Sequence, residues 1–144
     1  MSSVKYELTP EEIEILKAFH GHLGPYLVAG VRCGRYAIAK LNADTHFGIE
    51  ADVQTPPAPP PSCFLDGIQI STGCTMGKMN LRHTVSEDII AKFRNRKTEE
   101  TLTVRLRPEA IVAAVEEMKL KNDVAGAAVI MQFTDEELLE ELDN

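Results

Sequence analysis

The chain of 144 residues has no tryptophan, and only three tyrosines and five phenylalanines supply aromatic rings. So few rings disfavour a platform on which nucleobases stack. Positive charge is also scarce, because 22 acidic and 15 basic residues give a formal net charge of −7. Domains that bind nucleic acid usually carry a basic patch, so the sequence predicts no nucleic-acid partner.

Long apolar runs are missing as well. No stretch approaches the roughly 18 apolar residues of a membrane span, and residues 1–9 lack the apolar centre of a secretory signal. We therefore expect a cytoplasmic protein with no membrane partner. The three cysteines, Cys33, Cys63 and Cys74, are an odd number, which in a cytosolic chain favours free thiols or metal ligands over a disulfide framework.

Length and composition predict a single domain over residues 1–144. Hydrophobic residues make up 44% of the chain and charged residues 26%, as is usual for globular proteins. A chain of this size buries enough surface to fold without disulfides. Five of the eight prolines fall in residues 56–61, which we interpret as an extended, rigid connector inside this domain.

Two helices are predicted near the N-terminus. Thr9 and Glu12 form a capping box around Pro10, so a helix begins there and fails at the glycines of residues 20–24. A second helix is expected from Pro25 to about Leu41, and its many small residues would allow another backbone to approach closely.

The remainder of the chain alternates strand and helix signals. Strands are expected at 50–55, 89–94 and 101–107, and helices at 62–71, from 108, at 122–131 and from 134. The fold class predicted is α+β, with N-terminal helices packed on an antiparallel sheet and with C-terminal helices.

His20 and His22 are the first candidates for chemistry. They flank Gly21 between the two predicted helices, so both imidazoles can point in one direction. The start of the helix at Pro25 would keep these rings neutral, which suits metal ligation or base catalysis.

Two cysteines are the next candidates. Cys63 would lie in the first turn of a helix, and Cys74 has Lys78 nearby, so both environments would favour a thiolate. Two imidazoles and two thiolates can form a four-ligand site for zinc or a similar ion.

Other interpretations stay open. The ten residues between Cys63 and Cys74 match no usual zinc-finger spacing. A nucleophilic enzyme is an alternative, with Cys63 or Cys74 attacking and His20 or His22 as base. Cys33, on an apolar helix, is assigned to the core.

Three blocks of the sequence resemble one known family. They are residues 19–25 (FHGHLGP), 63–69 (CFLDGIQ) and 72–81 (TGCTMGKMNL), in this order. Together they resemble the FmdE family, which takes its name from formylmethanofuran dehydrogenase, and the similarity spans about residues 10–110.

The resemblance implies an α+β domain, a homodimer, and a metal near the junction of the three blocks, with zinc or another divalent transition metal expected. The implied metal ligands are drawn from His20, His22, Cys63 and Cys74. The other polar positions that match the family, which would line the pocket, are Asp66, Gln69 and Lys78.

Two departures from the family pattern matter. Gly24 stands where many members have a cysteine, which weakens any redox-pair interpretation. The C-terminal zinc ribbon of some members is absent from this sequence. The family name reflects an association with a molybdenum or tungsten enzyme of one-carbon metabolism, whose redox chemistry would belong to other cofactors.

The sequence thus predicts a metal-binding protein that acts as an accessory or catalytic module, with a molybdenum or tungsten enzyme as its expected partner. If it is an enzyme, three ligands would bind the metal, His20 would act as acid or base, and Lys78 would hold an anionic substrate. The alternatives are a non-catalytic subunit with a structural metal and a metal-free Cys-His nucleophile.

Overall fold

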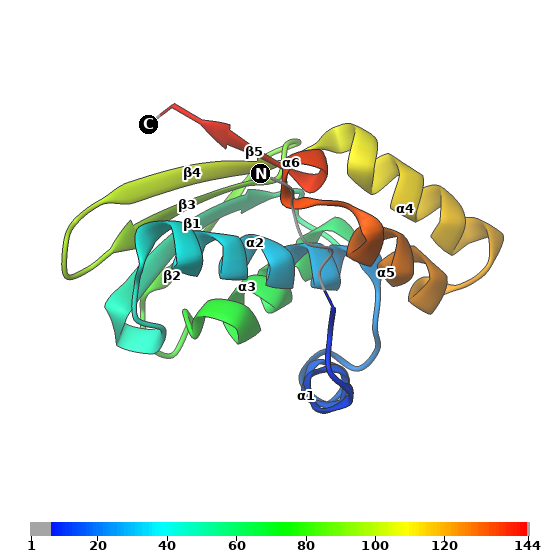
Figure 1. Ribbon diagram of the computed structural model, residues 1–144, viewed down its shortest axis with the longest axis horizontal. Coiled ribbons are helices and arrows are strands. Elements are labelled where there is room, and N and C mark those ends of the chain that lie inside the picture. Colours follow the sequence, from blue (N-terminus) through cyan, green and yellow to red (C-terminus); the bar gives the residue numbers. More distant parts are fainter. Residues whose placement is uncertain (1–6, 144) are drawn as a thin grey trace.

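The computed structural model describes residues 7–143, which fold into helices packed against one five-stranded sheet (Figure 1). The helices are α1 (Pro10–His20), α2 (Pro25–Leu41), α3 (Phe64–Thr72), α4 (Pro108–Leu120), α5 (Asp123–Gln132) and α6 (Asp135–Leu138). The strands are β1 (Ile49–Thr55), β2 (Leu81–Val85), β3 (Ile90–Asn95), β4 (Thr101–Leu106) and β5 (Leu139–Leu142). Two short 3-10 turns, η1 (His46–Gly48) and η2 (Pro61–Cys63), complete this part of the chain.

The sheet confirms the α+β class but is mixed. Its strand order is β2-β1-β3-β4-β5, and β1 and β2 are parallel whereas every other pair is antiparallel. The prediction of a purely antiparallel sheet was wrong because α3 carries the chain back across the sheet between β1 and β2. Strand β2 gave no alternating signal, since it is an edge strand in which only Leu81 is buried.

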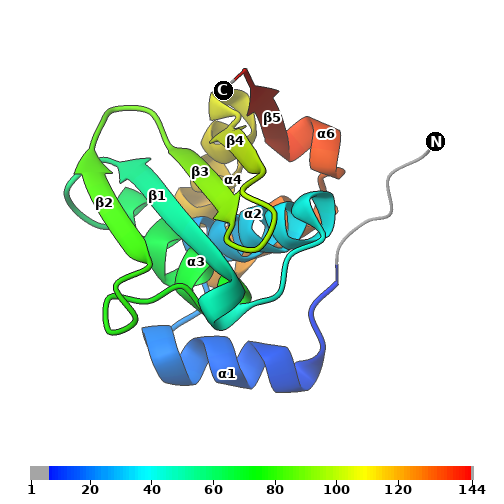
Figure 2. The ribbon, with the colours of Figure 1, turned by 90° about the vertical axis from the view of Figure 1, so that its left-hand side faces the viewer.

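Helices α2 and α3 cover one face of the sheet, and α4 and α5 continue this layer beyond it (Figures 1 and 2). The covered face of each central strand is apolar, with Phe93 and Val104 packing against Phe64 and Ile68 of α3 in one core. Cys33 is fully buried in that core, as predicted. The alternating burial along β1 leaves the opposite face of the sheet polar.

Helices α2 and α3 approach closely, as the small residues of α2 predicted. A Cβ added to Gly30 would lie 2.2 Å from the Phe64 carbonyl oxygen, and one added to Gly67 would lie 2.2 Å from the Leu27 carbonyl oxygen. Only glycine fits between backbones at this distance. The contact fixes α3 rigidly against α2.

Helix α1 lies apart from the layer of helices (Figure 1). It begins with the predicted capping box of Thr9 and Glu12, and it ends at Gly21, whose φ of 103° is left-handed. Its buried residue Leu16 joins Leu27 and Val31 of α2 in a small second cluster.

The proline-rich segment differs from its prediction. Residues 57–60 turn instead of extending, and the backbone N–H of Ser62 donates to the Ala58 carbonyl. The turn leads directly through η2 into α3, so the segment is a corner within the domain. Within residues 7–143, no helix is long and apolar enough to cross a membrane.

Candidate functional site

His20 and His22 come together because α1 stops between them. Gly21 adopts the left-handed conformation and donates its N–H to the Lys17 carbonyl, which caps the helix. The two imidazole centroids are then 4.8 Å apart. The loop therefore presents two rings side by side where α2 begins, as the sequence predicted.

His20 is held by helix α3. Its side chain is 8% exposed, and Nδ1 donates to Oδ2 of Asp66 at 2.5 Å. In the neutral ring, this bond leaves the lone pair on Nε2. Nε2 is buried and has no hydrogen-bond partner among the described residues. A buried acceptor left without a partner is costly, so this atom calls for a ligand.

His22 has a carboxylate partner of its own. Its Nδ1 lies 3.0 Å from Oδ2 of Asp123, the first residue of α5, and both side chains are about half exposed. Both histidines are thus oriented by an acidic side chain through the same ring nitrogen. The opposite ring nitrogen, Nε2, remains available in each.

Cys63 lies in the same place. It ends η2, precedes α3, and lines with His20 and His22 a cavity of about 180 Å³. Burial raises the pKa of the Cys63 thiol, and the charges of Asp66 and Asp123 raise it further. Desolvation and the two carboxylates thus oppose the helix field on which the prediction of a thiolate at Cys63 relied.

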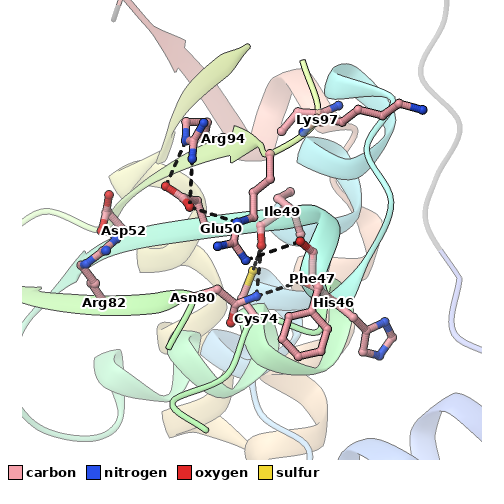
Figure 3. A network of polar contacts seen from close by, with 12 residues as sticks. His46, Phe47, Ile49, Glu50, Asp52, Cys74, Asn80, Arg82, Arg94 and Lys97 are labelled. Atoms are coloured by element: carbon pink, nitrogen blue, oxygen red, sulfur yellow. Dashed lines mark hydrogen bonds and ion pairs between the residues drawn. The ribbon is translucent and has the colours of Figure 1, made fainter. Parts of the chain in front are cut away.

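Cys74 and Lys78 lie at the opposite end of α3. Cys74 is buried, its Sγ donates to the Ile49 carbonyl at 3.4 Å, and burial raises its pKa despite the opposing charge of Lys78 (Figure 3). A nine-residue helix such as α3 rises about 13 Å, so one ion cannot reach both Cys63 and Cys74. The structure brings together three of the four predicted ligands and separates the fourth.

The other predicted residues divide in the same way. Asp66 is near the cavity through its bond to His20, whereas Lys78 lies with its Nζ 5.9 Å from the centroid of the Phe47 ring. Gln69 is half-buried on α3 and is not among the described residues that line the cavity. Only Asp66 of these three is placed to influence the histidines.

Several residues of the site escaped sequence reasoning. Tyr26, Met118 and Asp123 line the cavity with the histidines. Asp123 was recognised only as part of a helix start, because nothing in its local pattern connects it with a histidine about a hundred residues earlier. Tyr26 directly follows the Pro25 that opens α2, and that position was a usable signal for a residue at the site.

The donor atoms that line the cavity are of a kind that binds metal ions. Among residues 7–143, no three His, Cys, Asp or Glu side chains converge closely enough to hold an ion as they stand. The orphaned Nε2 of His20, the Nε2 of His22 and the Cys63 thiol are nevertheless nitrogen and sulfur donors of the kind that zinc prefers. They line one cavity, and binding would require them to come closer together.

Comparison with known proteins agrees with this architecture. The structure is similar to the crystal structure of a tungsten formylmethanofuran dehydrogenase FmdE-like protein from Syntrophus aciditrophicus, with a TM-score of 0.68 and 21% sequence identity. The match covers 100% of this chain and 78% of that one. At this identity the likeness concerns the fold.

Two sequence comparisons add to it. Over 72 residues the chain is 35% identical to a probable S-adenosyl-L-methionine-binding protein of Archaeoglobus fulgidus, which covers 45% of this chain. The chain spans only 18% of the length of that relative. The model of the FmdE family, described as molybdenum formylmethanofuran dehydrogenase operon, matches residues 19–141. This chain therefore belongs to the FmdE family.

Proposed function

We propose that this protein binds one zinc or similar divalent ion through His20, His22 and Cys63, and that it serves as an accessory or catalytic module beside a molybdenum or tungsten enzyme. One observation carries the proposal. The His20 ring is buried, a carboxylate holds its Nδ1, and its Nε2 has no partner among the described residues.

The carboxylates beside the rings support a metal role. Histidines that ligate metals usually donate their second ring nitrogen to a carboxylate or carbonyl, which fixes the tautomer and raises the basicity of the ligand. Asp66 stands in this relation to His20, and Asp123 to His22.

Three protein donors leave one position of a tetrahedral ion for a substrate, as in catalytic zinc sites. An ion in that place supplies Lewis-acid polarisation of a substrate oxygen. Cys63 would lose its proton on binding, because a cation would offset the burial and the charges of Asp66 and Asp123, which raise the pKa of this thiol. His20 is assigned to the metal and not to proton transfer, since its free nitrogen is the ligand.

Lys78 has no place in this proposal. It lies beside Phe47 at the far end of α3, so it cannot hold a substrate next to His20. Cys74 is left out for the same reason, and it is assigned to the architecture of the fold.

The geometry disfavours the metal-free Cys-His nucleophile. Nε2 of His20 accepts no hydrogen bond from any described residue, so Cys63 is not paired with it. The pKa of Cys63 is raised, whereas an activated nucleophile needs a lowered one. A purely structural metal is disfavoured by the open cavity beside the donors.

Family membership supports the proposed cellular context. The family is described by the molybdenum formylmethanofuran dehydrogenase operon, which supports a partner among molybdenum or tungsten enzymes of one-carbon metabolism. The proposal includes a homodimer and a cytoplasmic location; three free cysteines suit that reducing compartment. Light scattering of the purified protein tests the dimer.

Cobalt(II) titration tests the proposed site. We expect wild type to bind about one ion per chain, with a near-ultraviolet thiolate-to-cobalt band from Cys63. His20→Ala should weaken binding by roughly 100-fold or more, whereas His83→Ala, which changes an exposed histidine of β2, should bind as wild type does. Equal binding by His20→Ala, or a wild type that binds no cobalt, would contradict the proposal.

A further inference from the structure

The cavity beside the proposed ligands is small and largely apolar. It measures about 180 Å³, and Pro59, Pro60 and Met118 line it together with the histidines. A cavity of about 150 Å³ is enough to hold benzene. The space therefore suits a head group of about one ring.

The charge of this cavity is negative. Asp123 lines it, and Asp66 is bonded to His20, which also lines it. Among the described residues that line it there is no lysine or arginine. An anionic head would be repelled, and an uncharged or cationic head would not.

A second cavity adjoins the first. It is an open cleft of about 720 Å³ between the end of α1 and the start of α5. Ile13, Leu23 and Val124 give it an apolar part, and Lys17 and Asn122 lie at the same cleft. His22 and Asp123 line both cavities, so the contact between these two side chains lies at the boundary between them.

We propose that the two cavities form one binding site for an elongated small molecule, with an uncharged or cationic head in the inner cavity and an apolar arm in the outer cleft. This inference rests on the proposed function only for the place where the head lies, next to His20 and Cys63. The phenol of Tyr26, which lines the inner cavity and whose pKa burial raises, stays protonated and offers the head a hydrogen-bond donor.

Ring compounds of equal size and different charge test the head. Benzylamine, benzamide and benzoate are titrated into full-length, metal-stripped protein and followed by NMR. We expect benzylamine and benzamide to bind at least roughly tenfold more tightly than benzoate. Asp123→Asn should reduce the preference for benzylamine over benzoate, and Asp88→Asn, an exposed carboxylate before β3, should leave it unchanged. Benzoate binding as well as benzylamine, or no probe binding, would overturn the inference.

A longer probe tests the arm. 4-Hexylbenzylamine should bind roughly tenfold more tightly than benzylamine, because its alkyl chain is buried in the outer cleft. Val124→Ser should remove much of that gain and leave benzylamine binding unchanged. Val112→Ser, an equally exposed change on α4, is the control. An alkyl chain that adds no affinity, or a gain that Val124→Ser leaves intact, would overturn the two-cavity site.

The experiments can refute the metal site and the two-cavity binding site independently of each other. The probe titrations use protein without metal, so a wild type that binds no cobalt but selects benzylamine over benzoate refutes the metal and supports this site. Cobalt binding with no selection among the probes refutes this site alone.

Discussion

The two ends of helix α3 carry similar residues and do opposite things. At its start, Cys63 lines a cavity with two histidines, and a buried ring nitrogen of His20 has no partner among the described residues. Beyond its end, Cys74 is buried and its thiol is bonded to the Ile49 carbonyl. Donor atoms without a partner indicate a place where a ligand could bind. Donor atoms that are already bonded, as around Cys74 and Asn80, form a structural connection, which we call the joint.

The joint connects three segments, which are the loop after α3, the turn η1 and the start of β1 (Figure 3). The Asn80 amide nitrogen donates to the carbonyls of His46 and Ile49, and its oxygen accepts from the backbone of Thr75. This cluster holds the loop after α3 against the start of β1. A motif with two glycines, one cysteine and one lysine is here a structural connection, although its composition resembles a binding loop.

The largest effect on the stability of the fold is expected where α3 packs against α2, because this contact positions both ends of α3. Gly67→Ala places a Cβ 2.2 Å from the Leu27 carbonyl oxygen, so the helices must separate. We expect the free energy of unfolding to fall by about 3 kcal/mol or more. Gly77→Ala is the matched control, since the nearest atom to its added Cβ is 4.0 Å away. Chemical denaturation of both variants measures the difference, and equal stability would refute the close contact.

Asn80→Ala should affect the joint and leave the cavity intact. Asn80 is 2% exposed and makes three hydrogen bonds, and its loss leaves buried backbone groups unpaired. We expect a loss of about 2 kcal/mol or more in unfolding free energy, with cobalt binding unchanged in the folded protein. Gln54→Ala, an exposed change on β1, should cost little. Loss of cobalt binding in folded Asn80→Ala would mean that the two ends are not independent.

Asp66→Asn should affect the cavity and leave the joint intact. The carboxylate that fixes the His20 tautomer becomes an amide, so the ring is no longer held with its lone pair on Nε2. Removal of such a partner typically lowers metal affinity by roughly 10- to 100-fold. Competition with a chromophoric chelator measures the change, with Asp52→Asn on the open face of the sheet as control. An unchanged affinity would remove Asp66 from the site.

The smallest effect concerns the titration of Cys63. Its raised pKa means that the native state keeps this proton above the ordinary thiol range near about 8.5. The native state then binds more protons than the unfolded state, so this contribution to stability is present below that range and is lost as pH rises.

Unfolding of metal-free protein between neutral and alkaline pH tests this sign. Wild type should lose stability with rising pH more steeply than Cys63→Ser, because that variant lacks the thiol. Asp123→Asn should move the alkaline transition of Cys63 downward by less than about one pH unit. A transition that moves upward, or a Cys63→Ser profile identical to wild type, would contradict the assigned cause.

Local signals in the sequence predicted much of the fold. The capping box at Thr9, the break at Gly21 and the proline at position 25 fix both N-terminal helices, and the structure has them where expected. The apolar alternation of β3 and β4 was equally informative. Strands β2 and β5 were missed because they lie at the two edges of the sheet, and their pairing is decided by the crossover through α3 and by the C-terminal return.

Only those features of the site that depend on neighbouring residues in the sequence could be predicted. Two histidines around a glycine, and a cysteine before a short helix, could be singled out from residue type and spacing. The separation of Cys63 from Cys74 depends on the length of α3, and the pairing of His22 with Asp123 depends on long-range packing. No local pattern indicates either of these, so the sequence predicted one group of four candidate ligands, of which three line the same cavity.

The most direct test of the difference between the two ends compares two serine variants. Elemental analysis and cobalt titration are carried out on wild type, Cys63→Ser and Cys74→Ser, each purified without a tag and shown to be folded. We predict about one ion per chain in wild type and in Cys74→Ser, and none in Cys63→Ser. Metal retained by Cys63→Ser and lost from folded Cys74→Ser would contradict the account.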